Sequence, residues 1–96
     1  MKKYYKINAT VWVYPGLGGW HFVTIDKTLS QTIKKTAQSY GAGFVKIKAT
    51  IGATSWQTAL FPHKQSGAYL ISIKKHVRKK EEIYEGDTAQ ITFELV

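Results

Sequence analysis

Strict alternation of apolar and polar residues is the feature that most limits how this chain can fold. The segment from Val45 to Ile51 is apolar at every second position, and the segments that begin at Tyr5 and at Thr88 repeat the pattern. Successive side chains of a β-strand point to opposite faces of a sheet, so this period indicates strands with one buried face. The sequence therefore predicts a domain built mainly of β-structure.

Six strands and two short helices are expected, which gives an α+β chain dominated by β-structure. Pro15 and its neighbouring glycines end the first run, and Pro62 is expected to stop the fourth strand. Thr28 and Gln31 have the spacing of a capping box at the start of the first helix. The expected strands are 5–13, 20–25, 44–51, 56–61, 68–73 and 88–95, and the expected helices are about 29–40 and 74–80.

The order of these elements repeats within the chain. We interpret residues 1–96 as a single domain made of two interlocked strand–helix–strand pseudo-repeats, at about 20–51 and 68–96. Identity between the two copies is slight, so the repeat is one of element order and of inward-facing positions. The alternative is a chance match between short elements, which any α+β chain can show.

Charge is distributed unevenly along the chain, whose formal net charge is +8. Residues 1–80 hold all fourteen Lys and Arg residues and a single acid, Asp26, whereas the remaining acids lie in residues 81–96. A basic surface attracts polyanions through non-specific electrostatics. The alternative is that the lysines only keep a small β-rich protein soluble and its sheet edges unpaired.

Cysteine is absent, which excludes disulfides, zinc–thiolate sites and thiol catalysis. The N-terminal residues begin like a signal peptide, but the next stretch alternates instead of forming a continuous apolar run. No segment approaches the roughly 20 apolar residues that a membrane span needs. We therefore expect a cytoplasmic protein that does not enter a membrane.

Catalytic and metal-binding signatures are also absent from the sequence. The histidines His21, His63 and His76 lack HxH or HxxxH spacing, so neither a metal nor a cofactor is expected. The acids of residues 81–87 are expected to neutralise nearby lysines and to shape a turn. No nucleophile motif such as GxSxG is present. The sequence therefore does not favour an enzyme.

Several short motifs follow one another along the chain. They are Gly19-Trp20, Val45 to Gly52, Trp56 to Pro62, Gly67-Ala68-Tyr69, and Lys74 to Arg78 with Gly86-Asp87. Together they resemble domain-of-unknown-function family 1905 over nearly the whole chain. This chain has Asp26 and Ser72-Ile73 where the family pattern has a proline and a leucine–proline step, and Asp is a good helix N-cap.

The resemblance implies a small double-split β-barrel, a pseudo-barrel closed at its ends by the helices. It also implies kinship in fold with AbrB-like transition-state regulators. Those proteins carry a similar strand–helix–Gly-Asp–strand unit with an arginine in the helix, and they build the barrel from two chains. Here the two internal copies would supply both halves. The family has no established activity, so the resemblance implies a fold without a function.

Two hypotheses for function from different classes follow from the side chains. The first is a non-catalytic binding module for nucleic acid or another polyanion. Its expected binding residues are Lys46, Lys48, Lys74, Lys75, Arg78 and Lys79. The second is a small-molecule or protein-partner adaptor with a shallow aromatic cleft, which would accept an anionic ligand or a stacked base.

The expected lining of that cleft is Trp12, Trp20, Trp56 and Arg78, with Lys74 or Lys75 supplying charge. The alternative for these tryptophans is packing in the core or at the barrel ends. The sequence leaves a monomer and a homodimer both open, although Lys2, Lys3 and Lys6 discourage edge pairing of the first strand.

Overall fold

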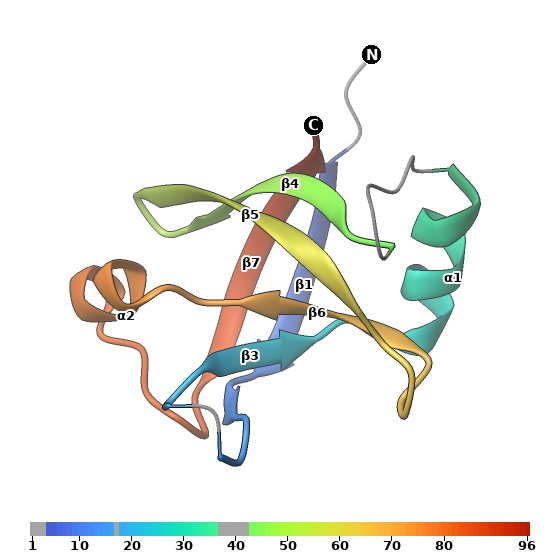
Figure 1. Cartoon of the computed structure of the whole chain (residues 1–96). Helices are drawn as coiled ribbons and strands as arrows, with labels where there is room; N and C mark the ends of the chain where they lie inside the picture. The colour runs from blue at the N-terminus through green and yellow to red at the C-terminus, as the bar shows by residue number, and fades with distance from the viewer. Residues whose placement is uncertain (1–3, 17, 37–42) are drawn as a thin grey trace.

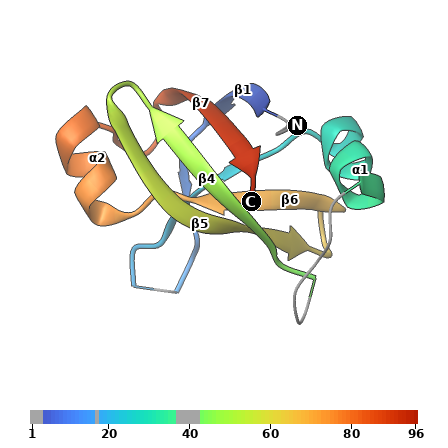
Figure 2. The ribbon, with the colours of Figure 1, turned by 90° about the horizontal axis from the view of Figure 1, so that it is seen from above.

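The alternating segments form one sheet of seven antiparallel strands, in the order β1-β7-β4-β5-β6-β3-β2 (Figure 1). The computed structural model describes residues 4–16, 18–36 and 43–96. Its helices are α1 (Lys27–Thr36) and α2 (Lys75–Glu81), which lie at opposite ends of the sheet (Figures 1 and 2). The strands are β1 Tyr4–Thr10, β2 Trp12–Val13, β3 His21–Thr24, β4 Val45–Ile51, β5 Thr54–His63, β6 Ala68–Ser72 and β7 Thr88–Leu95.

The sheet curls into a half-barrel around one core. In Figure 1, β3, β5 and β6 lie in front of β1 and β7. β1 and β2 stand at opposite ends of the strand order, although only Val11 separates them in the chain. The Val11 N–H donates to the Asp87 carbonyl and the Val11 carbonyl accepts from the Gly86 N–H, both at 2.8 Å. The two edges of the sheet therefore approach each other at this residue, and the mainly β class predicted from the sequence is confirmed.

The described residues form seven strands where the sequence predicts six, because the first predicted strand is in fact two. Thr10 pairs with Thr88 of β7, whereas Trp12 pairs with Phe22 of β3. The chain thus changes partner strand at Val11. The alternation of side chains continues through this change, so it gives no sign that the strand is divided.

The predicted end of the fourth strand at Pro62 is wrong, because β5 continues to His63. β4 begins at Val45, which pairs with Leu60, so among the described strands the part of β5 after Leu60 pairs with β6. Proline has no N–H to donate and is tolerated where one side of a strand has no partner. The position of the neighbouring strand explains why Pro62 is compatible with a strand here.

The capping box predicted at Thr28 is also wrong, because α1 begins earlier, at Lys27. The Leu29 N–H donates to Asp26 Oδ1 at 2.6 Å, so Asp26 is the residue that caps the helix. The expectation that Asp26 permits a helix start is confirmed. The predicted C-terminal end of this helix, at 37–42, lies outside the described residues, as do Lys2 and Lys3.

The core fills the space inside the curled sheet and is closed by one side of each helix. The predicted inward residues of β4 are buried, and Lys46 and Lys48 between them are exposed. Ile33 of α1 and Val77 of α2 are fully buried against the sheet. Burial of one such side chain contributes roughly 1.5–3 kcal/mol, so these two residues fix where each helix sits. No helix within the described ranges is long and apolar enough to cross a membrane.

Candidate anion-binding site

A pocket of about 340 Å³ lies where the loop before β3 and the end of β6 meet the start of α2. We call it the Arg78 pocket. Its lining residues are Gly18, Gly19, Trp20, His21, Ser72, Ile73, Lys74, Lys75 and Arg78. Three of these side chains are cationic, and no carboxylate of the described residues lines the pocket. Its electrostatic potential therefore favours an anion.

The Arg78 guanidinium is held in one orientation by two hydrogen bonds. Nε donates to the Ile73 carbonyl at 3.2 Å, and Nη1 donates to His21 Nε2 at 3.3 Å. His21 Nδ1 donates to the Gly19 carbonyl at 2.5 Å, so the network assigns the proton of a neutral ring to Nδ1 and makes Nε2 the acceptor. The remaining N–H groups of Arg78 are available for an anion, and a planar guanidinium suits the oxygens of a phosphate.

The short helix α2 places these cations on the outside of the domain. Val77 is fully buried, so the helix is anchored by its inner side. Lys74 occupies the N-cap position with an extended backbone (φ −65°, ψ 152°) and makes no side-chain capping bond. Glu82 ends the helix in the left-handed region (φ 54°), and its N–H donates to the Arg78 carbonyl. Lys74, Lys75 and Arg78 are consequently presented along one short stretch of chain.

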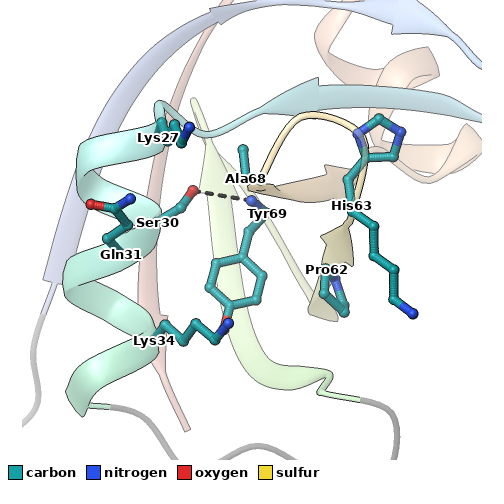
Figure 3. A pocket seen from close by; sticks show the side chains of 10 residues that line it. Lys27, Ser30, Gln31, Lys34, Pro62, His63, Ala68 and Tyr69 are labelled. Atoms are coloured by element: carbon teal, nitrogen blue, oxygen red, sulfur yellow. Dashed lines mark hydrogen bonds between the residues drawn. The ribbon is translucent and has the colours of Figure 1, made fainter.

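A second basic pocket, of about 310 Å³, lies at the other end of the sheet, between α1 and the hairpin of β5 and β6 (Figure 3). We call it the Ser30 pocket. Its lining residues are Lys27, Ser30, Gln31, Lys34, Pro62, His63, Lys64, Gly67, Ala68 and Tyr69. Three lysines contribute to it and no carboxylate of the described residues does.

Ser30 is only 3% exposed and uses its hydroxyl entirely within the protein. Its Oγ donates to the Ile25 carbonyl at 3.3 Å and accepts from the Tyr69 N–H at 3.0 Å, the bond that Figure 3 draws. Burial raises the pKa of the Tyr69 phenol above its usual value, so Tyr69 contributes a neutral ring and hydroxyl to this pocket. The fixed polar groups of the Ser30 pocket are therefore uncharged, and its lysines come from exposed positions.

The structure brings four of the predicted site residues together, since Trp20, Lys74, Lys75 and Arg78 all line the Arg78 pocket. Lys79 lies on the other side of Arg78, in a hollow that also includes Glu85, Tyr84 and Ile83. Lys46 and Lys48 lie on β4 and do not line the Arg78 pocket. Lys48 pairs in register with Glu94 of β7, and both line a different hollow.

The other two predicted tryptophans do not line the Arg78 pocket. Trp56 is 5% exposed in the core, where Nε1 donates to the Ser72 carbonyl at 3.2 Å. Trp12 is half-buried, and its Nε1 donates to Thr24 Oγ1 at 2.9 Å. The cleft expected from the sequence is thus reduced to Trp20 and the cations near it.

Sequence reasoning missed His21 as a partner of Arg78 and missed the Ser30 pocket completely. His21 and Arg78 are 57 positions apart, so no local motif connects them. The strand–helix–strand repeat is the only pattern in the sequence that relates to this contact. It predicts that the two units interlock, which would bring the strand of His21 close to the helix of Arg78. Among the residues with described positions, no three His, Cys, Asp or Glu side chains lie close enough to hold a metal ion.

The curled sheet and the Arg78 pocket define a small, mainly β domain with a basic, tryptophan-bordered pocket at one end. A family model described as "Domain of unknown function (DUF1905)" matches residues 8–93. The chain belongs to this family, which confirms the resemblance seen in its motifs. No curated protein matches the chain. The family description states no activity, so function has to be inferred from the site itself.

Proposed function

We propose that this domain is a non-catalytic binding module for nucleic acid or another polyanion, and that the Arg78 pocket contacts phosphates. The observation that carries the proposal is the fixed guanidinium of Arg78, which shares its pocket with Lys74 and Lys75 and with no carboxylate of the described residues. A cation that is already oriented loses little side-chain entropy on binding. The net charge of +8 adds a long-range attraction for polyanions.

The dependence of binding on salt tests this proposal. Anisotropy of a labelled oligonucleotide is measured against protein concentration, from low to physiological ionic strength. Each phosphate contact contributes about 0.7 to the slope of log K against log salt for a single strand, so three pocket cations predict a slope of about −2. Lys74→Ala and Lys75→Ala are each expected to reduce that slope by about 0.7.

Lys80→Ala is the matched control, because Lys80 is exposed on the same helix but does not line the Arg78 pocket. Removing its charge should change the affinity less than either pocket substitution. The proposal fails if neither DNA nor RNA binds at low salt. It also fails if Lys80→Ala weakens binding as much as Lys74→Ala.

The size of the Arg78 pocket supports a second candidate, an adaptor for an anionic small molecule, since ligand pockets measure about 300–1,000 Å³. Oligonucleotides of increasing length and a nucleoside monophosphate distinguish the two candidates. A polyanion module gains affinity as the ligand lengthens, because more phosphates are contacted. An adaptor binds the monophosphate as tightly as the oligonucleotide.

We also propose that the half-barrel is a double-split β-barrel made of two pseudo-repeats and related in fold to AbrB-like regulators. Support comes from the pairing of corresponding strands, β3 with β6 and β4 with β7. Two reciprocal hydrogen bonds add to it: the Ile25 N–H donates to the Tyr69 carbonyl and the Ile73 N–H donates to the His21 carbonyl, both at 2.9 Å. An experimental structure in which a two-fold rotation fails to place α1 on α2 would contradict this proposal.

A further inference from the structure

A continuous cluster of aromatic rings lies outside the core, on strands β2, β3 and β5 and the segments next to them. We call it the aromatic face, and its members are Trp12, Tyr14, Trp20, Phe22, Phe44 and Phe61. Phe22 is at its centre, with ring centroids of Trp12, Tyr14, Trp20 and Phe61 at 5.5, 5.9, 5.9 and 6.0 Å. Phe22 is 4% exposed but is not part of the core cluster, so these rings contribute to its burial.

Two rings of the aromatic face are open to solvent. Trp20 is 52% exposed and Phe44 is 42% exposed. The Trp20 ring stacks on the Phe22 ring at 27°, so it is held against the protein while about half of the residue stays exposed. Phe44 packs on Phe61 with 5.1 Å between centroids, which extends the row of rings away from Trp20. An exposed, ordered row of flat apolar rings marks a binding surface.

The aromatic face lies between the two basic pockets. Trp20 lines the Arg78 pocket directly. At the other side, the ring of Trp12 lies 6.4 Å from the ring of His63, which lines the Ser30 pocket. One basic pocket therefore adjoins the aromatic face at Trp20 and the other near Trp12, and no carboxylate of the described residues lines either pocket. A surface of flat apolar rings that adjoins two basic pockets fits a ligand with flat apolar groups on an anionic backbone.

We propose that the aromatic face is a base-stacking platform and that its ligand is single-stranded nucleic acid. Phosphates occupy the Arg78 pocket, and unstacked bases lie on Trp20 and along the row of Phe61 and Phe44. The proposal rests on the proposed function, because it identifies which polyanion binds. In a duplex the base faces are covered by neighbouring bases, so a duplex offers only phosphates and base edges to this surface.

Substitution of Trp20 tests the stacking step separately from the phosphate contacts. Trp20→Leu keeps apolar bulk and removes the aromatic face, and since Trp20 is exposed the domain should still fold. Stacking on one aromatic side chain corresponds to a roughly 5- to 140-fold change in affinity. We therefore expect Trp20→Leu to weaken single-strand binding by a factor in that range and to weaken binding of an equally long duplex much less. Trp20→Tyr retains a stacking ring and should recover most of the loss.

Tyr4→Leu is the matched control, because Tyr4 is an exposed ring on β1, outside the aromatic face. Tyr4→Leu should change neither the affinity for the single strand nor the affinity for the duplex. Equal binding of single strand and duplex, with no effect of Trp20→Leu, overturns the stacking proposal and leaves the polyanion module standing. Absence of any nucleic-acid binding at low salt overturns both. A dimer in sedimentation velocity that Trp20→Leu converts to a monomer shows that the aromatic face joins two copies, which also overturns the proposal.

Discussion

The Ser30 pocket and the Arg78 pocket each lie beside one of the two helices, but their hydrogen-bonding groups are used differently. In each pocket one side chain donates to the carbonyl of the isoleucine that precedes the helix start, Ser30 to Ile25 at 3.3 Å and Arg78 to Ile73 at 3.2 Å. Ser30 is buried and has both of its hydrogen bonds inside the protein, whereas Arg78 is partly exposed and retains N–H groups for a ligand. The hydrogen bonds of Ser30 therefore connect parts of the fold, whereas the guanidinium of Arg78 keeps further donors.

The starts of the two helices also differ: α1 has a stabilising side-chain cap and α2 has none. Asp26 caps α1 through its side chain, while Lys74, which precedes α2 in the same way, makes no such bond. Replacing a good N-cap residue by a poor one costs about 1 kcal/mol. The start of α2 thus has lower local stability and places a cation in a pocket. A residue that is locally unfavourable, and that has a plausible role in binding, is typical of a functional site.

The largest effect expected from this comparison is on binding, from Arg78→Ala. Charge-assisted hydrogen bonds contribute about 1.5–3 kcal/mol, so affinity for a single-stranded oligonucleotide should fall roughly 10- to 150-fold. Fluorescence anisotropy at fixed salt measures this loss. Arg78→Lys keeps the charge without the planar donor group and should recover only part of the affinity. Unchanged affinity in Arg78→Ala would show that the two pockets do not differ in function.

Ser30→Ala, in contrast to Arg78→Ala, should lower stability and leave binding unchanged. The Tyr69 N–H would lose its acceptor in a buried position, which lowers the free energy of unfolding by about 1–3 kcal/mol. Nucleic-acid affinity should stay the same. Urea denaturation measures the change, with Thr32→Ala, an exposed position on the same helix, as the control. A loss of affinity without a loss of stability would reverse the roles given to the two pockets.

Asp26→Ala should lower the free energy of unfolding by about 1 kcal/mol, because α1 loses its cap. The melting temperature and the urea midpoint both report this change. Asp26→Asn retains a side-chain oxygen that can accept from the Leu29 N–H, so it should cost much less. Equal losses from the two substitutions would mean that the charge of Asp26, and not its hydrogen bond, stabilises the helix.

The smallest expected effect on stability comes from Lys74→Asp, and it has the opposite sign. The backbone of Lys74 already has the conformation of an N-cap, so Asp there should raise the free energy of unfolding by up to about 1 kcal/mol. The same change puts a carboxylate into the Arg78 pocket and should weaken its attraction for phosphates. Lys74→Ala should weaken binding without the gain in stability. A protein that gains stability and keeps its affinity would separate Lys74 from the site.

The alternation in the sequence is sufficient to predict β4 and β7, because each has one buried face, and the positions of Lys46 and Lys48 follow directly. The alternation does not predict that the first strand is divided at Val11 or that β5 continues through Pro62. Both features depend on which neighbouring strand is present, and that is a property of the assembled sheet. Side-chain period determines which face a residue occupies but does not determine its partner strand.

The candidate site is predictable only where its residues are close in sequence. Lys74, Lys75 and Arg78 belong to one short segment, and their grouping is visible without a structure. The contact of Arg78 with His21 depends on how β3 lies beside β6, so it is not visible in the sequence. For Trp56 the sequence leaves open a place in a cleft or packing in the core, and the structure places it in the core.

Strand β1 is synthesised long before the strand that holds it in place, because its hydrogen-bonding partner over Tyr4–Thr10 is β7, Thr88–Leu95. A nascent chain at the ribosome therefore carries β1 with unpaired backbone groups until the last strand has emerged. Pairing between such distant segments makes folding slow, on the order of milliseconds to seconds, and exposes strand edges to wrong partners meanwhile. We expect this domain to complete its folding only after β7 has left the ribosome, with translation rate and chaperone supply deciding its yield.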